Sequence, residues 1–182
     1  AACPSHPPVI NPPPFGILPE MTWHTLMYEP FKLLVRKETK ERNWRALLES
    51  QPFLRYERTS FGGRLVTRFL RDNSLVVQDS IELDEIAGLM NLVSEGLGIA
   101  LVPMVEAYLP IPPGVRAISL GEKTFYREIG ILRKGASSRR PVILALEKCL
   151  RAAVSPAHDT SGSRPELATH SPKGFLLRAV VA

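Results

Sequence analysis

Apolar and polar positions along the middle of the chain follow two different periods, and these periods predict alternating strands and helices. Apolar runs that alternate with polar residues or are unbroken are typical of strands, whereas apolar residues spaced by three and four are typical of helices. The pattern predicts strands at 31–36, 52–57, 74–83, 98–103, 116–120 and 127–133, and helices at 41–50, 61–70, 86–97 and 142–154. Such an order is typical of an α/β fold with a mainly parallel sheet.

Hydroxyl, carboxylate and glycine positions mark the ends of two of these helices. Ser60 provides an N-cap hydroxyl for one helix, and Asp84 is expected to cap the next. That second helix runs into Gly96 and Gly98 and then into an unbroken apolar strand. A dinucleotide fingerprint needs the opposite order, strand then glycines then helix, so a phosphate-binding loop is excluded here. Gly96 is instead predicted to end the helix in the left-handed conformation, and Gly98 to allow close packing.

The segment TSFGGR, residues 59–64, has the strand-then-helix order that a ligand-binding turn requires. Thr59 and Ser60 present hydroxyls beside the first-turn amides, with Arg58 nearby. An ordinary N-cap, with glycines that allow close packing of strand and helix, explains the same residues equally well. Arg55 and Arg58 could likewise hold a carboxylate in a bidentate manner or remain solvated surface charges. Both pairs of alternatives stay open.

The two ends of the chain lack this periodicity. Residues 1–19 contain seven prolines, which predict an extended segment in which Val9 and Ile10 could be the remnant of a strand. Residues 155–182 are rich in Ser, Pro, Thr, His and Gly and are predicted to be a flexible tail. No stretch reaches the roughly 18 to 20 apolar residues that a membrane helix needs, so no membrane partner is expected.

The distribution of charge argues against direct nucleic-acid binding by this chain, although its net charge is +5. Residues 36–71 carry ten Lys and Arg against four Asp and Glu, whereas residues 72–115 carry seven Asp and Glu and no Lys or Arg. Such segregation favours internal ion pairs or a polar dimer interface over a continuous phosphate-binding surface. Cys3 and Cys149 have neither disulfide-framework nor metal-ligand spacing, so a cytoplasmic setting without metal or cofactor is expected.

Three segments in the same order and spacing resemble the effector-binding domain of LysR-type transcriptional regulators. They are WHTLMYEPFKLLV (23–35), PFLRYERTSFGGRLVTRFLR (52–71) and ELDEIAGLMNLVSEGLGIALVP (82–103), within a resemblance that runs from about residue 12 to 154. It implies a type 2 periplasmic-binding-protein-like fold, with two Rossmann-like lobes, mainly parallel sheets and an effector cleft. The implied division is a proline-rich lead segment and remnant of lobe I at 1–32, lobe II at 33–110, a return to lobe I at 111–154, and the tail at 155–182.

The resemblance also implies a function. A domain of this family senses a small effector, forms a homodimer or homotetramer, and controls transcription through a helix-turn-helix DNA-binding domain that is absent from this sequence. The opening elements of lobe I are absent too, so the first lobe is expected to be incomplete. The family suggests a carboxylic or aromatic acid as the effector.

The family's site residues can be carried over one at a time. Thr59 and Ser60 match the turn that faces the effector, and Arg58 lies beside that turn. Asp84 matches the start of the other helix at the cleft, where an aspartate would repel an anionic effector and suit a cation or a hydroxyl donor. A plain N-cap explains Asp84 as well.

Two other functions remain open at this point. A stand-alone solute-binding protein would share the fold, and a helix-turn-helix encoded upstream would exclude it. An α/β enzyme would use Glu82, Asp84 and Glu85 as paired acids, but carboxylates at a helix start also complement the helix dipole. The sequence contains no nucleophile elbow and no Walker loop, so an enzyme is not expected.

Overall fold

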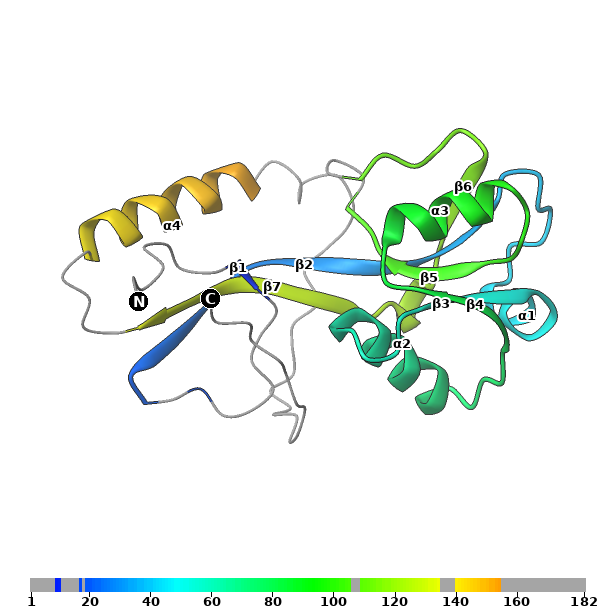
Figure 1. Cartoon of the computed structure of the whole chain (residues 1–182), viewed down its shortest axis with the longest axis horizontal. Helices are drawn as coiled ribbons and strands as arrows, with labels where there is room; N and C mark the ends of the chain where they lie inside the picture. The colour runs from blue at the N-terminus through cyan, green and yellow to red at the C-terminus, as the bar shows by residue number, and fades with distance from the viewer. Residues whose placement is uncertain (1–8, 11–16, 18, 106–108, 135–139, 155–182) are drawn as a thin grey trace. The chain divides into compact units, whose positions relative to one another are not determined.

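The structure is a computed structural model that describes residues 9–10, 17, 19–105, 109–134 and 140–154. The chain divides into two compact units. Unit 1 consists of Ala1–Tyr28 and Glu128–Ala182, and unit 2 consists of Glu29–Arg127. Both boundaries fall inside long strands, β2 (Met21–Arg36) and β7 (Tyr126–Lys134), so each of these strands contributes residues to both units (Figure 1).

The sheet of unit 2 combines antiparallel and parallel pairs. The C-terminal half of β2 pairs antiparallel with β5 (Ala100–Pro103) and with β6 (Val115–Ser119). Residues 32–34 of β2 pair with both partners, which therefore lie on opposite sides of β2. On the far side of β5, a parallel bridge from Phe53 to Ile99 leads to β3 (Pro52–Tyr56), which pairs in parallel with β4 (Gln78–Leu83).

The prediction of a mainly parallel sheet is wrong for the main sheet. Its strand order is β1-β7-β2-β5 with β6 paired to β2, and the strand pairs β1/β7, β2/β5 and β2/β6 are all antiparallel. All four residues of β5 are buried, as its unbroken apolar character predicted. Burial on both faces does not fix strand direction, however, and the long strand beside β5 runs the opposite way.

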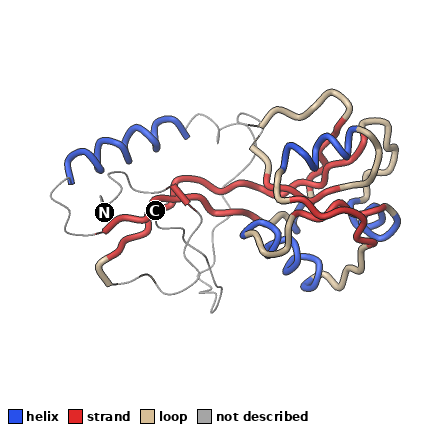
Figure 2. The backbone as a smooth tube through the Cα atoms, viewed as in Figure 1, coloured by secondary structure: helices blue, strands red, loops and turns tan. Residues whose placement is uncertain are grey.

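Three helices cover the two faces of the unit 2 sheet (Figures 1 and 2). One core cluster lies under α1 (Trp44–Ser50) and α2 (Phe61–Asp72), and a second lies under α3 (Ile86–Ser94). Successive side chains along a strand point to alternate clusters, because neighbouring residues of a strand face opposite sides of the sheet. β3 sends Phe53 to the first cluster and Leu54 to the second. A 3-10 turn, Gly121–Lys123, precedes β7.

Most of the predicted elements are present, with three corrections. β2 begins ten residues before the predicted strand, because Pro30 and the mixed polarity of the MTWHTLMYEP segment concealed it. The predicted strand at 74–83 is shorter and exposed: β4 begins at Gln78, after a turn in which Ser74 has a φ of 53°. Asp84 does not cap α3, because the N-cap position is Glu85 and no side-chain hydrogen bond caps that helix.

Other local predictions are confirmed. The helix predicted at 41–50 is present as α1, which begins after the N-cap Asn43, and Gly96 adopts the predicted left-handed conformation with a φ of 78°. A Cβ on Gly98 would lie 2.4 Å from the carbonyl oxygen of Pro52, so this glycine allows the chain to pass close to β3. Among the helices of the described residues, none has the length and apolar character of a membrane span. The predicted tail at 155–182 lies outside the described residues.

Unit 1 contains β1 (Val9–Ile10), the first part of β2, most of β7 and α4 (Arg140–Val154). Val9 and Ile10 form a strand, as predicted, and this strand pairs antiparallel with β7. Trp23 Nε1 and the Thr25 hydroxyl both donate to the Glu128 carboxylate, which ties β2 to β7. A Cβ on Gly130 would lie 2.4 Å from the indole of Trp23, so this position admits only glycine.

Glu147 on α4 is a buried carboxylate that three basic side chains surround. Its carboxylate lies 2.9 Å from Arg151 Nη2, 3.3 Å from His24 Nδ1 and 3.6 Å from Arg133 Nη1. Burial acting alone would raise the pKa of Glu147. The hydrogen bond from Arg151 and the positive charges around it outweigh burial and lower the pKa below its usual value of 4.5.

Glu147→Gln is expected to destabilise the protein by about 2 kcal/mol at pH 7, since it leaves neighbouring cations without their counter-charge. Because the pKa of Glu147 is lower in the folded state, the unfolded chain takes up its proton first as pH falls. The stabilisation is therefore complete above about pH 5 and is lost progressively as pH falls through the folded pKa. Thermal unfolding from pH 7 to pH 3 should show the wild-type and variant midpoints converging, and a constant gap would contradict this.

Glu49→Gln is the control for that experiment. Glu49 lies 3.9 Å from Arg45 on α1, and both side chains are about half exposed. Exposed pairs of this kind contribute about 0 to 1 kcal/mol.

Candidate functional site

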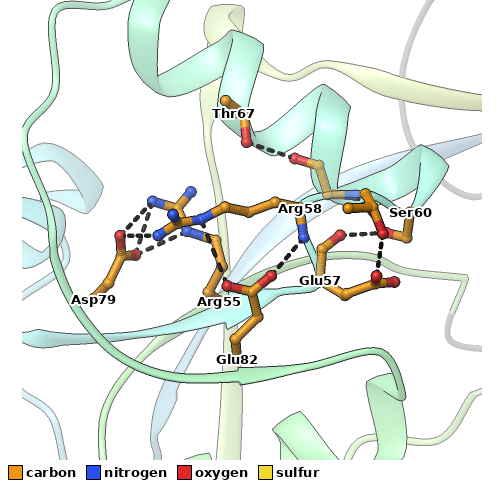
Figure 3. Close-up of polar contacts among 9 residues, drawn as sticks. Arg55, Glu57, Arg58, Ser60, Thr67, Asp79 and Glu82 are labelled. Carbon is orange, nitrogen blue, oxygen red and sulfur yellow. Dashed lines mark hydrogen bonds and ion pairs between the residues drawn. The ribbon is translucent and has the colours of Figure 1, made fainter. Parts of the chain in front are cut away.

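The turn between β3 and α2 is built around the hydroxyl of Ser60. Its Oγ accepts a hydrogen bond from the amide of Gly63 at 2.9 Å and donates to the carbonyl oxygen of Glu57 at 2.7 Å. The amide of Ser60 also donates to that carbonyl, at 3.1 Å. The predicted N-cap is therefore confirmed (Figure 3). Two hydrogen bonds from Ser60 to the carbonyl oxygen of Glu57 close the turn from residue 57 to 60.

Two glycines let α2 begin directly against β3. A Cβ on Gly63 would lie 1.8 Å from the carbonyl oxygen of Glu57, and a Cβ on Gly62 would lie 2.3 Å from the ring of Tyr56. Neither distance is compatible with a side chain at its present position. The close packing of strand and helix predicted for the TSFGGR segment is thus confirmed.

The side chain of Thr59 lies on the exposed side of the turn. Its hydroxyl donates to the carboxylate of Glu57, and its carbonyl oxygen accepts a hydrogen bond from Arg64. Glu57 thus contributes both its main chain and its side chain to the turn. Glu57 could not be singled out from the sequence, since a carboxylate at the end of a strand is common.

Arg55 and Arg58 converge on one carboxylate, that of Asp79 on β4 (Figure 3). Arg55 binds it in the bidentate manner, Nε to Oδ1 at 2.8 Å and Nη2 to Oδ2 at 3.1 Å. Arg58 donates to Asp79 as well, and its Nε lies 3.6 Å from Glu82 Oε2. The two arginines therefore hold internal carboxylates. For Arg55 the open alternative of a solvated surface charge is wrong.

Arg55 is the more buried of the two arginines. Only 8% of its side chain is exposed, and its guanidinium lies over the ring of Phe53, 4.8 Å from the ring centre. Its Nη1 is buried and has no hydrogen-bond partner in the described part of the chain. Asp79, which sequence reasoning missed, is thus the counter-charge of a buried cation. In the structure Phe53 on β3 lies opposite Asp79 on β4. The sequence does not indicate this register, because the second strand was expected to start at residue 74.

Asp84 lies next to this turn because β3 and β4 are parallel. The amide of Glu57 donates to the carbonyl of Leu83 at 2.8 Å, so the residues that follow the two strands emerge at the same edge. Asp84 and Glu85 are exposed, and neither has an ion pair or side-chain hydrogen bond within the described residues. The structure thus brings together Arg58, Thr59, Ser60 and Asp84 at one edge.

The paired acids proposed for an enzyme do not form a catalytic arrangement. The Glu82 carboxylate accepts the amide of Arg58 at 2.9 Å and faces its guanidinium, while Asp84 and Glu85 point into solvent. An exposed acid lacks the desolvated surroundings that tune a general acid or base. Over the described residues, no group of three His, Cys, Asp or Glu side chains could hold a metal ion.

Comparison with known proteins gives one family and several related structures. The family model of the LysR substrate binding domain matches residues 9–155. A mutant of OxyR from Corynebacterium glutamicum superposes with a TM-score of 0.66 at 20% identity over 82% of this chain and 48% of its own. This chain therefore spans about half the length of that relative. No curated protein matches the sequence.

Two further structures carry small molecules. The CcmR regulatory domain of Synechocystis PCC6803 in complex with 2-PG superposes with a TM-score of 0.67 at 14% identity, over 80% of this chain and 72% of its own. The BenM effector binding domain with its effector benzoate superposes with a TM-score of 0.62 at 17% identity, over 84% of this chain and 71% of its own. At these identities the likeness establishes the fold alone.

Proposed function

Because this chain belongs to the LysR substrate-binding domain family, we propose that its β3–α2 turn contacts the effector of a bacterial transcriptional regulator. Family membership confirms the resemblance found in the sequence, and it makes the chain an effector-binding regulatory domain with the α/β, type 2 periplasmic-binding-protein type of fold. The family is non-enzymatic, so the enzyme alternative is not kept. The observation that carries the proposal is the capped turn at the carboxyl edge of two parallel strands, where α/β folds bind ligands.

The finer division into lobes belongs to the same proposal. Lobe II would occupy residues 33–110, and lobe I would be assembled from residues 1–32 and 111–154 as an incomplete, Rossmann-like counterpart. The compact unit formed by Glu29–Arg127 supports a separate second lobe. Residues 155–182 would be a tail.

The remaining parts of the proposal concern the whole protein. Control of transcription would operate through a helix-turn-helix DNA-binding domain outside this sequence, in a cytoplasmic homodimer or homotetramer. The 2-PG and benzoate bound by CcmR and BenM support a small molecule as the effector. A stand-alone solute-binding protein is the second candidate, supported only by the shared type of fold.

The four candidate residues would have different roles in effector binding. Thr59 has an exposed hydroxyl and would contact the effector directly, whereas Ser60 is fully engaged as the helix cap and would hold the turn in place. Arg58 is held between Asp79 and Glu82, which favours a positioning role. Asp84 would face the effector from the adjacent strand end.

Thermal unfolding of the chain against a library of small metabolites tests this function. An effector should raise the unfolding midpoint in a concentration-dependent manner, because binding to the folded state stabilises it by mass action. Thr59→Ala should then weaken the affinity for that effector about two- to tenfold, the effect of losing one neutral hydrogen bond. Thr67→Ala is the matched control, since Thr67 donates to the carbonyl of Gly63 within the same helix. Equal weakening by both variants would rule out the turn as the site.

A further inference from the structure

Tyr56 has a nearly buried side chain whose hydroxyl group is unpartnered. It is the last residue of β3, only 8% of it is exposed, and its ring belongs to the core cluster under α3. A buried tyrosine hydroxyl usually has a hydrogen-bond partner, but this one makes no hydrogen bond within the described residues. Unlike Arg55 Nη1, it is not sealed from solvent, so a ligand can reach it.

The ring of Tyr56 packs against the first turn of α2. A Cβ on Gly62 would lie 2.3 Å from Cε1 of the ring and 3.2 Å from Cζ, the atom that carries the hydroxyl. Ser60 accepts the third and fourth amides of this helix through its Oγ and its carbonyl oxygen. The first two amides, those of Phe61 and Gly62, have no acceptor in the part of the chain that the structure describes. One unpartnered hydroxyl and two unpartnered amides therefore lie together at the carboxyl end of β3.

The charges at this end of β3 oppose a charged ligand group of either sign. Because β3 and β4 are parallel and end side by side, Asp84 and Glu85 follow β4 next to the end of β3, and both are exposed. With Glu57, which follows Tyr56, they make three carboxylates that would repel an anion. Arg64, which has no carboxylate partner within the described residues, and the positive end of the α2 dipole would repel a cation.

An uncharged hydroxyl group suits these surroundings, because its oxygen accepts from an amide while its proton goes to a carboxylate or to a tyrosine oxygen. We propose that the Tyr56 hydroxyl and the amides of Phe61 and Gly62 bind an uncharged hydroxyl group of the effector. This rests on the function proposed above, that the β3–α2 turn contacts the effector. It departs from the acid expected of the family and from the benzoate bound by BenM. It agrees with the expectation that an aspartate at position 84 suits a hydroxyl donor.

Matched probes separate the hydroxyl group from the two charged alternatives. An NMR titration that follows the backbone amides of the chain would compare benzyl alcohol, benzoate and benzylamine, which share one carbon skeleton. Benzyl alcohol should bind about three- to tenfold more tightly than either charged probe, because each charged probe meets groups of its own sign. The amide signals of Phe61 and Gly62 should shift on binding, since their protons gain an acceptor.

Tyr56→Phe removes the hydroxyl group and keeps the packed ring. Because that hydroxyl has no partner in the free chain, the midpoint of thermal unfolding should stay unchanged. The affinity for benzyl alcohol should fall about two- to tenfold, the effect of losing one neutral hydrogen bond. Tyr126→Phe is the matched control, because Tyr126 on β7 is 46% exposed and should alter neither the midpoint nor the affinity.

Several results would overturn the inference. Benzoate or benzylamine that binds as tightly as benzyl alcohol would refute the hydroxyl assignment. Benzyl alcohol binding that Tyr56→Phe and Tyr126→Phe affect equally would exclude Tyr56 from the site. A lower unfolding midpoint for Tyr56→Phe in the free chain would show that its hydroxyl has a structural partner instead.

The remaining results distinguish this inference from the function on which it depends. If no probe binds while a compound from the metabolite library raises the unfolding midpoint, both tyrosine variants are titrated with that compound. The inference is then supported if the compound carries a hydroxyl group and Tyr56→Phe alone weakens its binding. Any other result refutes the inference and leaves the effector-binding function standing. If neither the probes nor the library binds the chain, both proposals fail.

Discussion

Gly63→Ala is expected to lower the free energy of unfolding by about 3 kcal/mol, at the upper end of what overpacking costs in a closely packed site. The added Cβ would lie 1.8 Å from the carbonyl oxygen of Glu57 and 2.6 Å from its carbonyl carbon. Both are backbone atoms, so no side-chain rotation can relieve the clash and α2 must move away from β3. Urea unfolding with a comparison of midpoints and slopes would measure the loss.

Gly88→Ala is the matched control for that measurement. Gly88 is also a helical glycine, within α3, but the nearest atom to an added Cβ is the flexible end of Leu83 at 3.4 Å. Alanine should stabilise the helix there by up to about 1 kcal/mol, because glycine has the lower helix propensity. Opposite signs for the two variants are thus expected. A Gly63→Ala protein as stable as the wild type would show that the start of α2 is not held against β3 as the structure places it.

Asp79→Ala should lower the free energy of unfolding by about 2 to 3 kcal/mol, the second largest effect expected. The variant leaves the Arg55 guanidinium buried without its bidentate partner, and breaking a fully buried pair costs about 3 to 5 kcal/mol. The lower figure reflects the exposure of Asp79, whose side chain is 36% accessible and lets water reach the broken pair. Thermal and urea unfolding would both report the change.

Asp72→Ala provides the comparison for this second prediction. Asp72 also pairs with two arginines, Arg68 and Arg71 on α2, but all three side chains are substantially exposed. Pairs of this kind contribute at most about 1 kcal/mol. If Asp79→Ala and Asp72→Ala lower the free energy of unfolding equally, the burial of Arg55 does not increase the contribution of its ion pair to stability. Arg55→Met combined with Asp79→Ala should recover part of the loss, since it removes the buried charge.

The strand and helix content of unit 2 could be predicted from its sequence because local signals there agree with the fold. Ser60, Gly62 and Gly63 combine a cap with two positions that have no room for a side chain, and both properties follow from the local order of strand, hydroxyl and glycines. Gly96 is a similar case, since a helix that ends in the left-handed conformation favours glycine at that position.

The features that were missed depend on which strands become neighbours. The pairing of Arg55 with Asp79 arises from the register of β3 against β4. The two residues are 24 positions apart in the sequence, and no local pattern indicates that they meet. The direction of the main sheet depends on β2, half of which lacks a strand pattern and includes Pro30. The cap assigned to Asp84 was misplaced by one residue, an error within the usual uncertainty of helix ends.

The division of the chain into two units also has a consequence for its synthesis. Glu29–Arg127 is a single uninterrupted stretch, so every residue of unit 2 has been made once Arg127 is added. Unit 1 is different, because β2 must wait for Glu128 and for α4 at the other end of the chain before its Trp23 and His24 find their partners. On the ribosome, the unit that contains the proposed effector turn can therefore fold first. The first strand residues to emerge, Val9 and Ile10, would remain unpaired until Gly130 and Ile131 of β7 follow them.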